Sequence, residues 1–83
     1  MPCMDPDIRA RYRMLQQEAD FALWRAREAA HAVRDRYAAA QRGDGAAPSE
    51  QDLQELGRLE SDAEAKYREL RDFLRAEFDH ATA

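Results

Sequence analysis

The tetrapeptide Glu28-Ala-Ala-His31 has a spacing that binds metal in some helical proteins. Side chains three residues apart project together from a helix, and di-iron four-helix bundles use Glu-x-x-His pairs in this way. One chain carries the pattern once, so a di-metal centre requires two copies meeting in a dimer. Because the chain has 17 acidic residues, one chance occurrence is unsurprising, and we expect an exposed glutamate beside a solvated histidine. No cofactor is predicted, and a metal-dependent oxidase assembled across a dimer stays open as an alternative.

Other catalytic chemistry lacks the residues that it needs. Cys3 precedes the first helix signal, Ser49 has the position of a helix cap, and Ser61 is expected to face solvent. A catalytic nucleophile needs an adjacent base, and phosphate binding commonly uses a glycine-rich loop before a helix. The sequence shows neither pattern, so we do not expect an enzyme.

The formal net charge of −4 is divided unevenly along the chain. From Asp5 to Arg42 there are eight arginines and six acids, whereas from Gly43 onward there are five bases and eleven acids. Opposite net charges favour antiparallel packing of the two halves and argue against nucleic acid as a partner. A run of carboxylates can imitate phosphates, so an alternative function is a phage-type inhibitor that blocks a nucleic-acid-binding protein. The acidic face in question comprises Glu55, Asp62, Glu69, Asp72 and Asp79.

Two long helices joined by one loop are predicted, preceded by a flexible N-terminus over residues 1–5. Aspartate caps a helix and proline suits its first position, so Asp5-Pro6 is a strong start signal. The first helix is expected over residues 6–42, the loop over 43–48 and the second helix over 49–80. Ser49 and Asp52 have the spacing of a capping box, with aspartate in place of the usual Glu or Gln. The fold class is therefore all-α, a single domain shaped as an antiparallel two-helix hairpin.

The composition indicates a cytoplasmic protein that does not enter a membrane. No apolar run approaches the roughly 18 residues that span a bilayer, and no secretory signal follows Met1. A lone cysteine suits a reducing compartment. Alanine and arginine are abundant while Lys66 is the only lysine, which suggests a bacterial or phage genome.

Small residues recur every seven positions in the first helix, as in a coiled coil. We expect this alanine stripe to pack against larger side chains of the second helix, without voids. Arg36 and Glu60 interrupt the apolar pattern near one level; we predict that they pair and fix the register, the alternative being that both turn to solvent. A tight fold at the loop would place Ala40 opposite Leu53, Ala26 opposite Tyr67, Ala22 opposite Leu70 and Ala19 opposite Leu74.

A second apolar face remains on the first helix, opposite the alanine stripe. Exposed aromatics clustered at helical spacing commonly mark an interface. We expect a homodimer that forms a four-helix bundle, because two helices alone cannot enclose a core. Two alternatives stay open: a protein partner that receives this face in a groove, and an inverted seam with the alanines outside. The predicted interface residues are Met14, Phe21, Leu23, Trp24, Tyr37, Phe73 and Phe78.

The function that these features favour is a small non-enzymatic helical interaction protein. It is expected to homodimerise and to bind a protein partner as an adaptor or regulator. Neither the partner nor the pathway follows from the residues.

Overall fold

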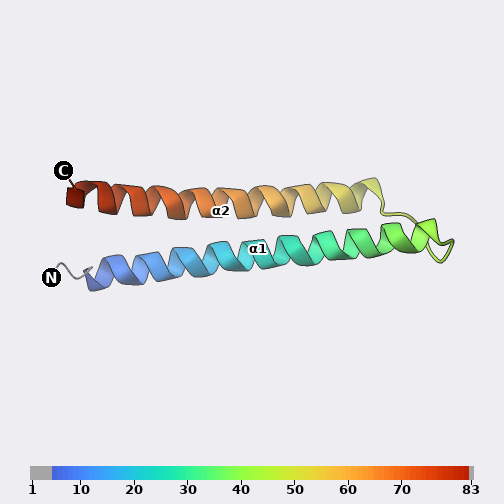
Figure 1. Cartoon of the computed structure of the whole chain (residues 1–83), viewed down its shortest axis with the longest axis horizontal. Helices are drawn as coiled ribbons and strands as arrows, with labels where there is room; N and C mark the ends of the chain where they lie inside the picture. Colours follow the sequence, from blue (N-terminus) through green and yellow to red (C-terminus); the bar gives the residue numbers. More distant parts are fainter. Residues whose placement is uncertain (1–4, 83) are drawn as a thin grey trace.

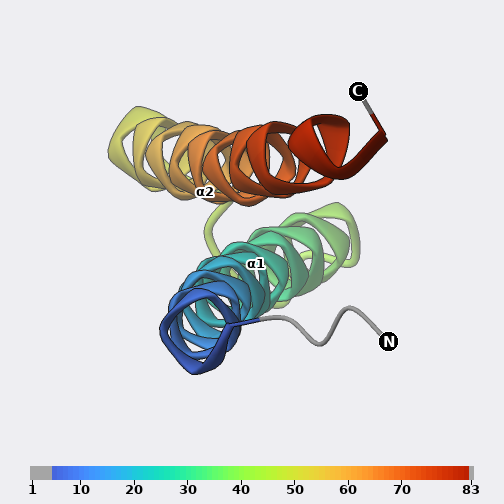
Figure 2. The ribbon, with the colours of Figure 1, turned by 90° about the vertical axis from the view of Figure 1, so that its left-hand side faces the viewer.

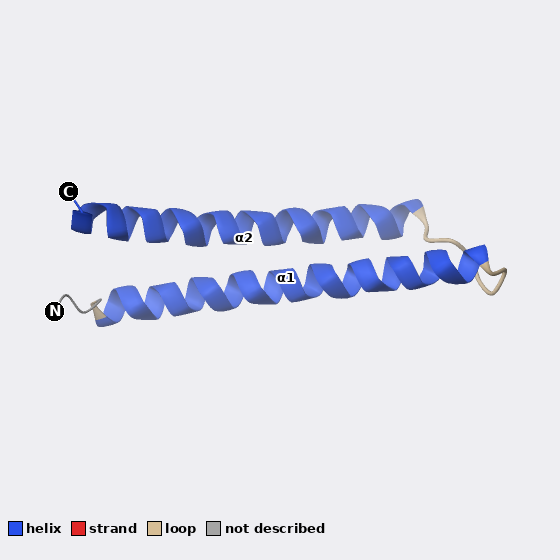
Figure 3. Cartoon of the chain, in the orientation of Figure 1, coloured by secondary structure: helices blue, strands red, loops and turns tan. Residues whose placement is uncertain are grey.

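The protein is a two-helix hairpin in the computed structural model, which describes residues 5–82 and the side chains of residues 5–78. Helix α1 spans Pro6–Gln41 and α2 spans Glu50–Thr82, and no strand occurs in the described part (Figure 3). The helices run antiparallel along a body of 62 × 17 × 16 Å, so the N-terminal end of α1 lies beside the C-terminal end of α2 (Figure 1). Residues 1–4 lie outside the described part, and the flexible N-terminus stays a prediction.

Local hydrogen bonds explain where α1 begins and ends. The Asp7 amide donates to Asp5 Oδ1 over 2.8 Å, which satisfies one of the unpaired amides of the first turn. At the other end Gly43 adopts a φ of 79°, and its amide donates to the Ala40 carbonyl. The Asp44 amide donates to the Ala39 carbonyl over 2.8 Å. This pair of bonds is a Schellman motif, whose left-handed residue is glycine because it carries no Cβ.

The start of α2 is a reciprocal capping box, as the spacing predicts. The Asp52 amide donates to Ser49 Oγ over 3.0 Å, and the Ser49 amide donates to Asp52 Oδ2 over 2.9 Å. Hydrogen bonding of the Asp52 carboxylate to the amide and the side chain of Ser49 lowers the pKa of this carboxyl below its ordinary value, and the nearby Arg36 guanidinium lowers it further. Aspartate therefore performs the role that Glu or Gln usually has in this motif.

The seam of α1 is the alanine stripe, which excludes the inverted arrangement. The buried residues of α1 are Leu15, Ala19, Ala22 and Ala26, and Ala19 is completely inaccessible. They form two clusters with α2: Ala22 and Ala26 pack with Leu59 and Ala63, while Leu15 and Ala19 pack with Leu70. Small side chains on α1 thus let the helices approach closely in the middle of the hairpin.

Helix α2 is rotated about its axis relative to the prediction. Leu59, Ala63 and Leu70 are buried, whereas Leu53, expected in the seam, is 46% exposed and Glu60 is exposed as well. Leu59 is therefore one of the central residues of the seam. None of the residues between Ala26 and Leu59, which form the loop and the adjoining parts of both helices, is buried. Figure 2 shows the two helices crossing rather than running strictly parallel.

The predicted register is wrong by between one and two helical turns. Leu70 packs with Leu15 and Ala19 rather than with Ala22, and Ala26 packs with Leu59 and Ala63 rather than with Tyr67. The cause is the loop, which folds back along α1 instead of turning tightly. A Cβ on Gly45 would lie 3.8 Å from the Ala39 Cβ, so the returning chain occupies the space where the first turn of α2 was expected. In Figure 1 the last turns of α1 extend past the start of α2.

This shift also changes the predicted register pair. Arg36 Nη1 donates to Asp52 Oδ2 over 2.7 Å, and Glu60 is not its partner. Because α2 begins beside Arg36, the nearest carboxylate on α2 is the one in its capping box. The guanidinium is 59% exposed and the carboxylate 33%, so the pair lies at the surface and not inside the seam.

Candidate interaction surfaces

An aromatic pair stands on the outside of α1, away from α2. Phe21 and Trp24 are 60% and 58% exposed, and their rings stack with centroids 6.1 Å apart and planes 23° apart. The Arg25 guanidinium carbon lies 6.0 Å from the Phe21 ring centroid, within cation–π range. Met14, which lies seven residues before Phe21 on the same stripe of α1, is 47% exposed. We call Met14, Phe21 and Trp24 the aromatic patch.

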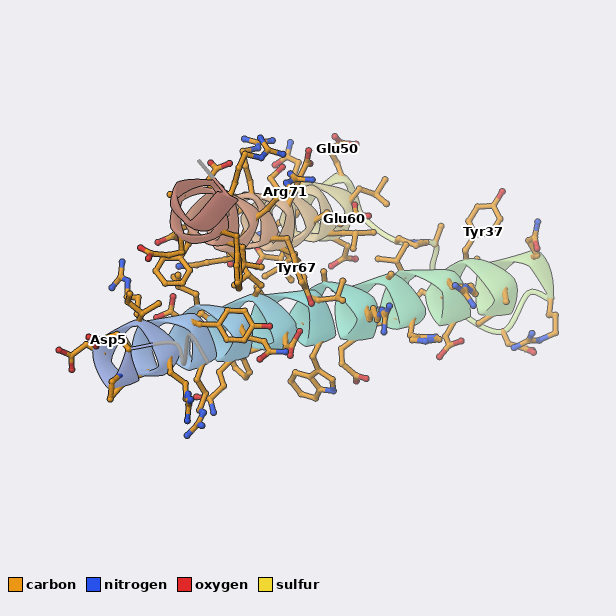
Figure 4. All side chains as sticks on the ribbon, turned by 60° about the vertical axis from the view of Figure 1, so that its left-hand side comes forward. Asp5, Tyr37, Glu50, Glu60, Tyr67 and Arg71 are labelled. Atoms are coloured by element: carbon orange, nitrogen blue, oxygen red, sulfur yellow. The ribbon has the colours of Figure 1, made fainter. Side chains whose placement is uncertain are left out.

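A second apolar surface is a groove along one flank of the hairpin, which we call the flank groove. Its middle section has a volume of about 340 Å³, and its section near the loop, about 430 Å³, shares Ala30 with it. Figure 4 shows Tyr37 at the loop end of α1 and shows Glu60 and Tyr67 on the side of α2 that faces α1. The apolar lining comprises Leu23, Ala26, Ala30, Val33, Tyr37, Ala47, Pro48, Leu53, Ala63 and Tyr67.

The opposite flank of the hairpin is filled by larger side chains away from the loop. Leu59 is buried there, and Phe73 is half-buried against the cluster of Leu15, Ala19 and Leu70. Lys66 Nζ lies 3.8 Å from Glu18 Oε2 across this flank. Nearer the loop this flank keeps a smaller hollow of about 140 Å³ between the two helices, beside Arg36 and Asp52. The flank groove is therefore the larger opening between the helices.

One polar contact joins the helices near the end of the flank groove. The Tyr67 hydroxyl donates to Asp20 Oδ1 over 2.6 Å. This hydrogen bond raises the pKa of Tyr67 above its ordinary value, because the neutral hydroxyl is the donor and a phenolate would face a carboxylate. Tyr67 thus fixes α2 to α1 while its ring lines the groove.

The predicted interface residues do not form one surface. Met14, Phe21 and Trp24 share the aromatic patch, whereas Leu23 and Tyr37 line the flank groove. The spacing along α1 places the stripe of Arg27 and Arg34 between these two surfaces. Phe73 belongs to the closed flank, and Phe78 is 53% exposed near the C-terminal end of α2.

The sequence reasoning missed the groove residues Val33, Ala47, Pro48 and Leu53. The predicted pairing with Ala40 placed Leu53 in the seam, whereas the structure places it at the loop end of the groove. The spacing of six residues between Gly43 and Ser49 was the available signal, since a chain of that length can double back along the helix.

The acidic face of α2 is interrupted by a base. Arg58 donates from Nε and Nη2 to the two carboxylate oxygens of Glu55, which lowers the pKa of that carboxyl. Asp62 is half-buried, Glu69 and Asp72 are exposed, and the side chain of Asp79 lies outside the described part. The face is therefore less uniformly negative than the sequence suggests.

Glu28 and His31 are both exposed on α1. Among the residues that the structure describes, no three His, Cys, Asp or Glu side chains gather closely enough to hold a metal ion. Neither described helix combines the length and apolarity required to cross a bilayer. Comparisons of the chain with protein-family models, with curated proteins and with solved structures gave no match.

Proposed function

We propose that this chain is a small non-enzymatic interaction protein that homodimerises and binds a protein partner as an adaptor or regulator. The observation that carries the proposal is the presence of two separate apolar surfaces, the aromatic patch and the flank groove, on a hairpin that encloses little core. No large side chain is fully buried among the described residues. Burial of apolar surface in an association would supply the stabilisation that two helices lack.

The aromatic patch supports the partner-binding part of the proposal. Trp is the residue most enriched among binding hot spots, and here its exposed ring is already held against Phe21. Ordering before binding lowers the entropy cost of association. Neither ring packs against α2, so removal of both leaves the hairpin intact.

Affinity capture from a bacterial lysate with wild type and with Phe21→Ser/Trp24→Ser tests the patch. The expected result is a specific protein retained by wild type and lost with the double variant, while circular dichroism shows unchanged helicity. Gln16→Ser/Gln41→Ser, which alters exposed residues on other stripes of α1, is the control and should retain the protein. Equal retention by the patch variant would contradict the assignment.

A further inference from the structure

We infer that the flank groove receives a second copy of this chain, with α1 of each copy lying against α2 of the other and both loops at the same end. The inference rests on the proposed homodimerisation. It adds which face is used and how the copies are oriented.

The groove has the shape of an unfilled helix-packing site. Its lining is apolar over both helices and the loop, and it runs from Tyr67 in the middle of the hairpin to Leu53 near the loop. Leu53 and Tyr37 are 46% and 57% exposed at its loop end, where the seam has no buried residue. A packed helix would cover these side chains, which the hairpin by itself leaves in water.

Gly57 supports close approach from outside the hairpin. It lies one turn after Leu53 and one turn before Glu60, on the stripe of α2 that lines the groove. A Cβ added there would meet nothing within 4 Å, so the packing of α2 on α1 does not require glycine. An interior helical glycine weakens a helix, and its missing side chain leaves the α2 backbone accessible to a neighbour.

The two rims of the groove carry opposite charges. Arg27 and Arg34 border it on α1, and Glu60 and Glu64 border it on α2. Within the described residues Arg27, Arg34 and Glu60 make no ion pair, and Glu64 pairs only with Arg68 of its own helix. The groove therefore presents a basic rim and an acidic rim that are not matched to each other inside one chain. A surface with these two rims is complementary to itself when one copy is turned over on the other.

Complementarity selects one of two symmetric arrangements. Arg27, Glu60 and Glu64 line the same section of the groove, so they lie at one level along the hairpin. A two-fold axis parallel to the helices keeps that level and places Arg27 of one copy against Glu60 and Glu64 of the other. A two-fold axis perpendicular to the helices within the interface would place α1 against α1, and arginines against arginines. Like-charge juxtaposition disfavours this second arrangement.

The arrangement also leaves the aromatic patch on the outer side of each α1. A dimer formed through the groove would therefore present two patches. Two partner molecules, or one partner with two sites, could then bind with increased avidity.

Charge reversal at the rims tests the inference. Sedimentation equilibrium is measured on wild type, on Arg27→Glu/Arg34→Glu, on Glu60→Arg/Glu64→Arg, and on an equimolar mixture of the two variants. The proposed dimer has two equivalent contacts, each between α1 of one copy and α2 of the other. In a dimer of either variant like charges face each other at both contacts, so we expect the dimer dissociation constant to rise at least about tenfold. The mixture restores opposite charges at both contacts and should recover wild-type association. Glu69→Arg/Asp72→Arg, which reverses charges outside the groove, is the control and should dimerise like wild type.

The outcomes separate the possible failures. A dimeric wild type whose rim variants also dimerise normally would overturn the groove and leave homodimerisation standing. A mixture that fails to recover association would overturn the arrangement of α1 against α2. A monomeric wild type would overturn the proposed homodimerisation, and this inference with it.

A distance measurement tests the orientation independently. Spin labels are attached to Asp44→Cys in a Cys3→Ser background, which places one label at the exposed loop of each copy. If both loops lie at the same end of the dimer, the distance between the two labels should be well below half of the 62 Å hairpin length. A distance between the labels close to the full 62 Å would contradict the placement of both loops at the same end.

Discussion

Arg36 of α1 donates to the same carboxylate oxygen of Asp52 that accepts the Ser49 amide at the start of α2. One oxygen thus belongs both to the helix cap and to the contact between the helices. The capping box fixes the position of the carboxylate, and the guanidinium then meets it at 2.7 Å. This shared oxygen ties the start of α2 to the level of Arg36 on α1, in the register that the loop imposes.

The capping box should make the stability of the hairpin depend on acid. The pKa of Asp52 is lowered below its ordinary value of 3.8, so its contribution is present above that pH and is lost as the pH falls through the folded-state pKa. Asp52→Asn should therefore be less stable than wild type near neutral pH and equally stable in strong acid. Thermal melts followed by circular dichroism at both pH values measure the difference. A difference that persists in acid would contradict the role of the ionised carboxylate.

Removal of the other half of the cap should also weaken α2. Ser49→Ala deletes the hydroxyl that accepts the Asp52 amide, and such losses cost about 0.5–2 kcal/mol. Urea unfolding followed by circular dichroism gives the value. Ser61→Ala, at an exposed interior position of α2, should change the free energy of unfolding by less than about 0.5 kcal/mol.

The bond from Tyr67 to Asp20 should make the hairpin sensitive to alkali. The pKa of Tyr67 is raised above its ordinary value of 10.0, so its contribution is present below that pH and is lost as the pH rises through the folded-state pKa. Tyr67→Phe should be less stable than wild type at neutral pH, and this difference should vanish in strong alkali. Thermal melts at both pH values test it. An undiminished difference in alkali would place the effect in packing alone.

Larger side chains in the alanine seam should lower the free energy of unfolding of the hairpin. Ala19 is completely inaccessible, so Ala19→Leu should cost about 1–3 kcal/mol through overpacking. Ala10→Leu makes the same change at an exposed position of α1 and should stay within about 0.5 kcal/mol of wild type. Urea unfolding of both variants measures the contrast. Equal effects at the two positions would contradict the observed seam.

The sequence predicted the two helices, their caps and the α1 seam because those features depend on local signals. The capping signals act within a few residues of the helix ends; they are Asp5-Pro6, Gly43 and the Ser49–Asp52 spacing. A repeat of seven residues marks the buried face of a helix whatever the position of the partner helix. The exposure of Phe21 and Trp24 followed from the same repeat. These predictions needed no knowledge of how the chain crosses the loop.

The register and the rotation of α2 could not be obtained in this way. Several alignments of alanine against leucine bury similar areas, and the loop decides among them by doubling back beside Ala39. Arg36 was recognised as a register residue, but its partner depended on where α2 begins. The flank groove was missed for the same reason, since Leu53 becomes exposed only when α2 is rotated.

The mass of the wild-type chain in solution shows whether the protein homodimerises. Sedimentation equilibrium over a range of protein concentrations, at moderate salt, distinguishes one chain from two. We expect twice the chain mass of 9.6 kDa, with dissociation on dilution and with rising salt as the rim charges are screened. A mass of 9.6 kDa at every concentration would contradict it.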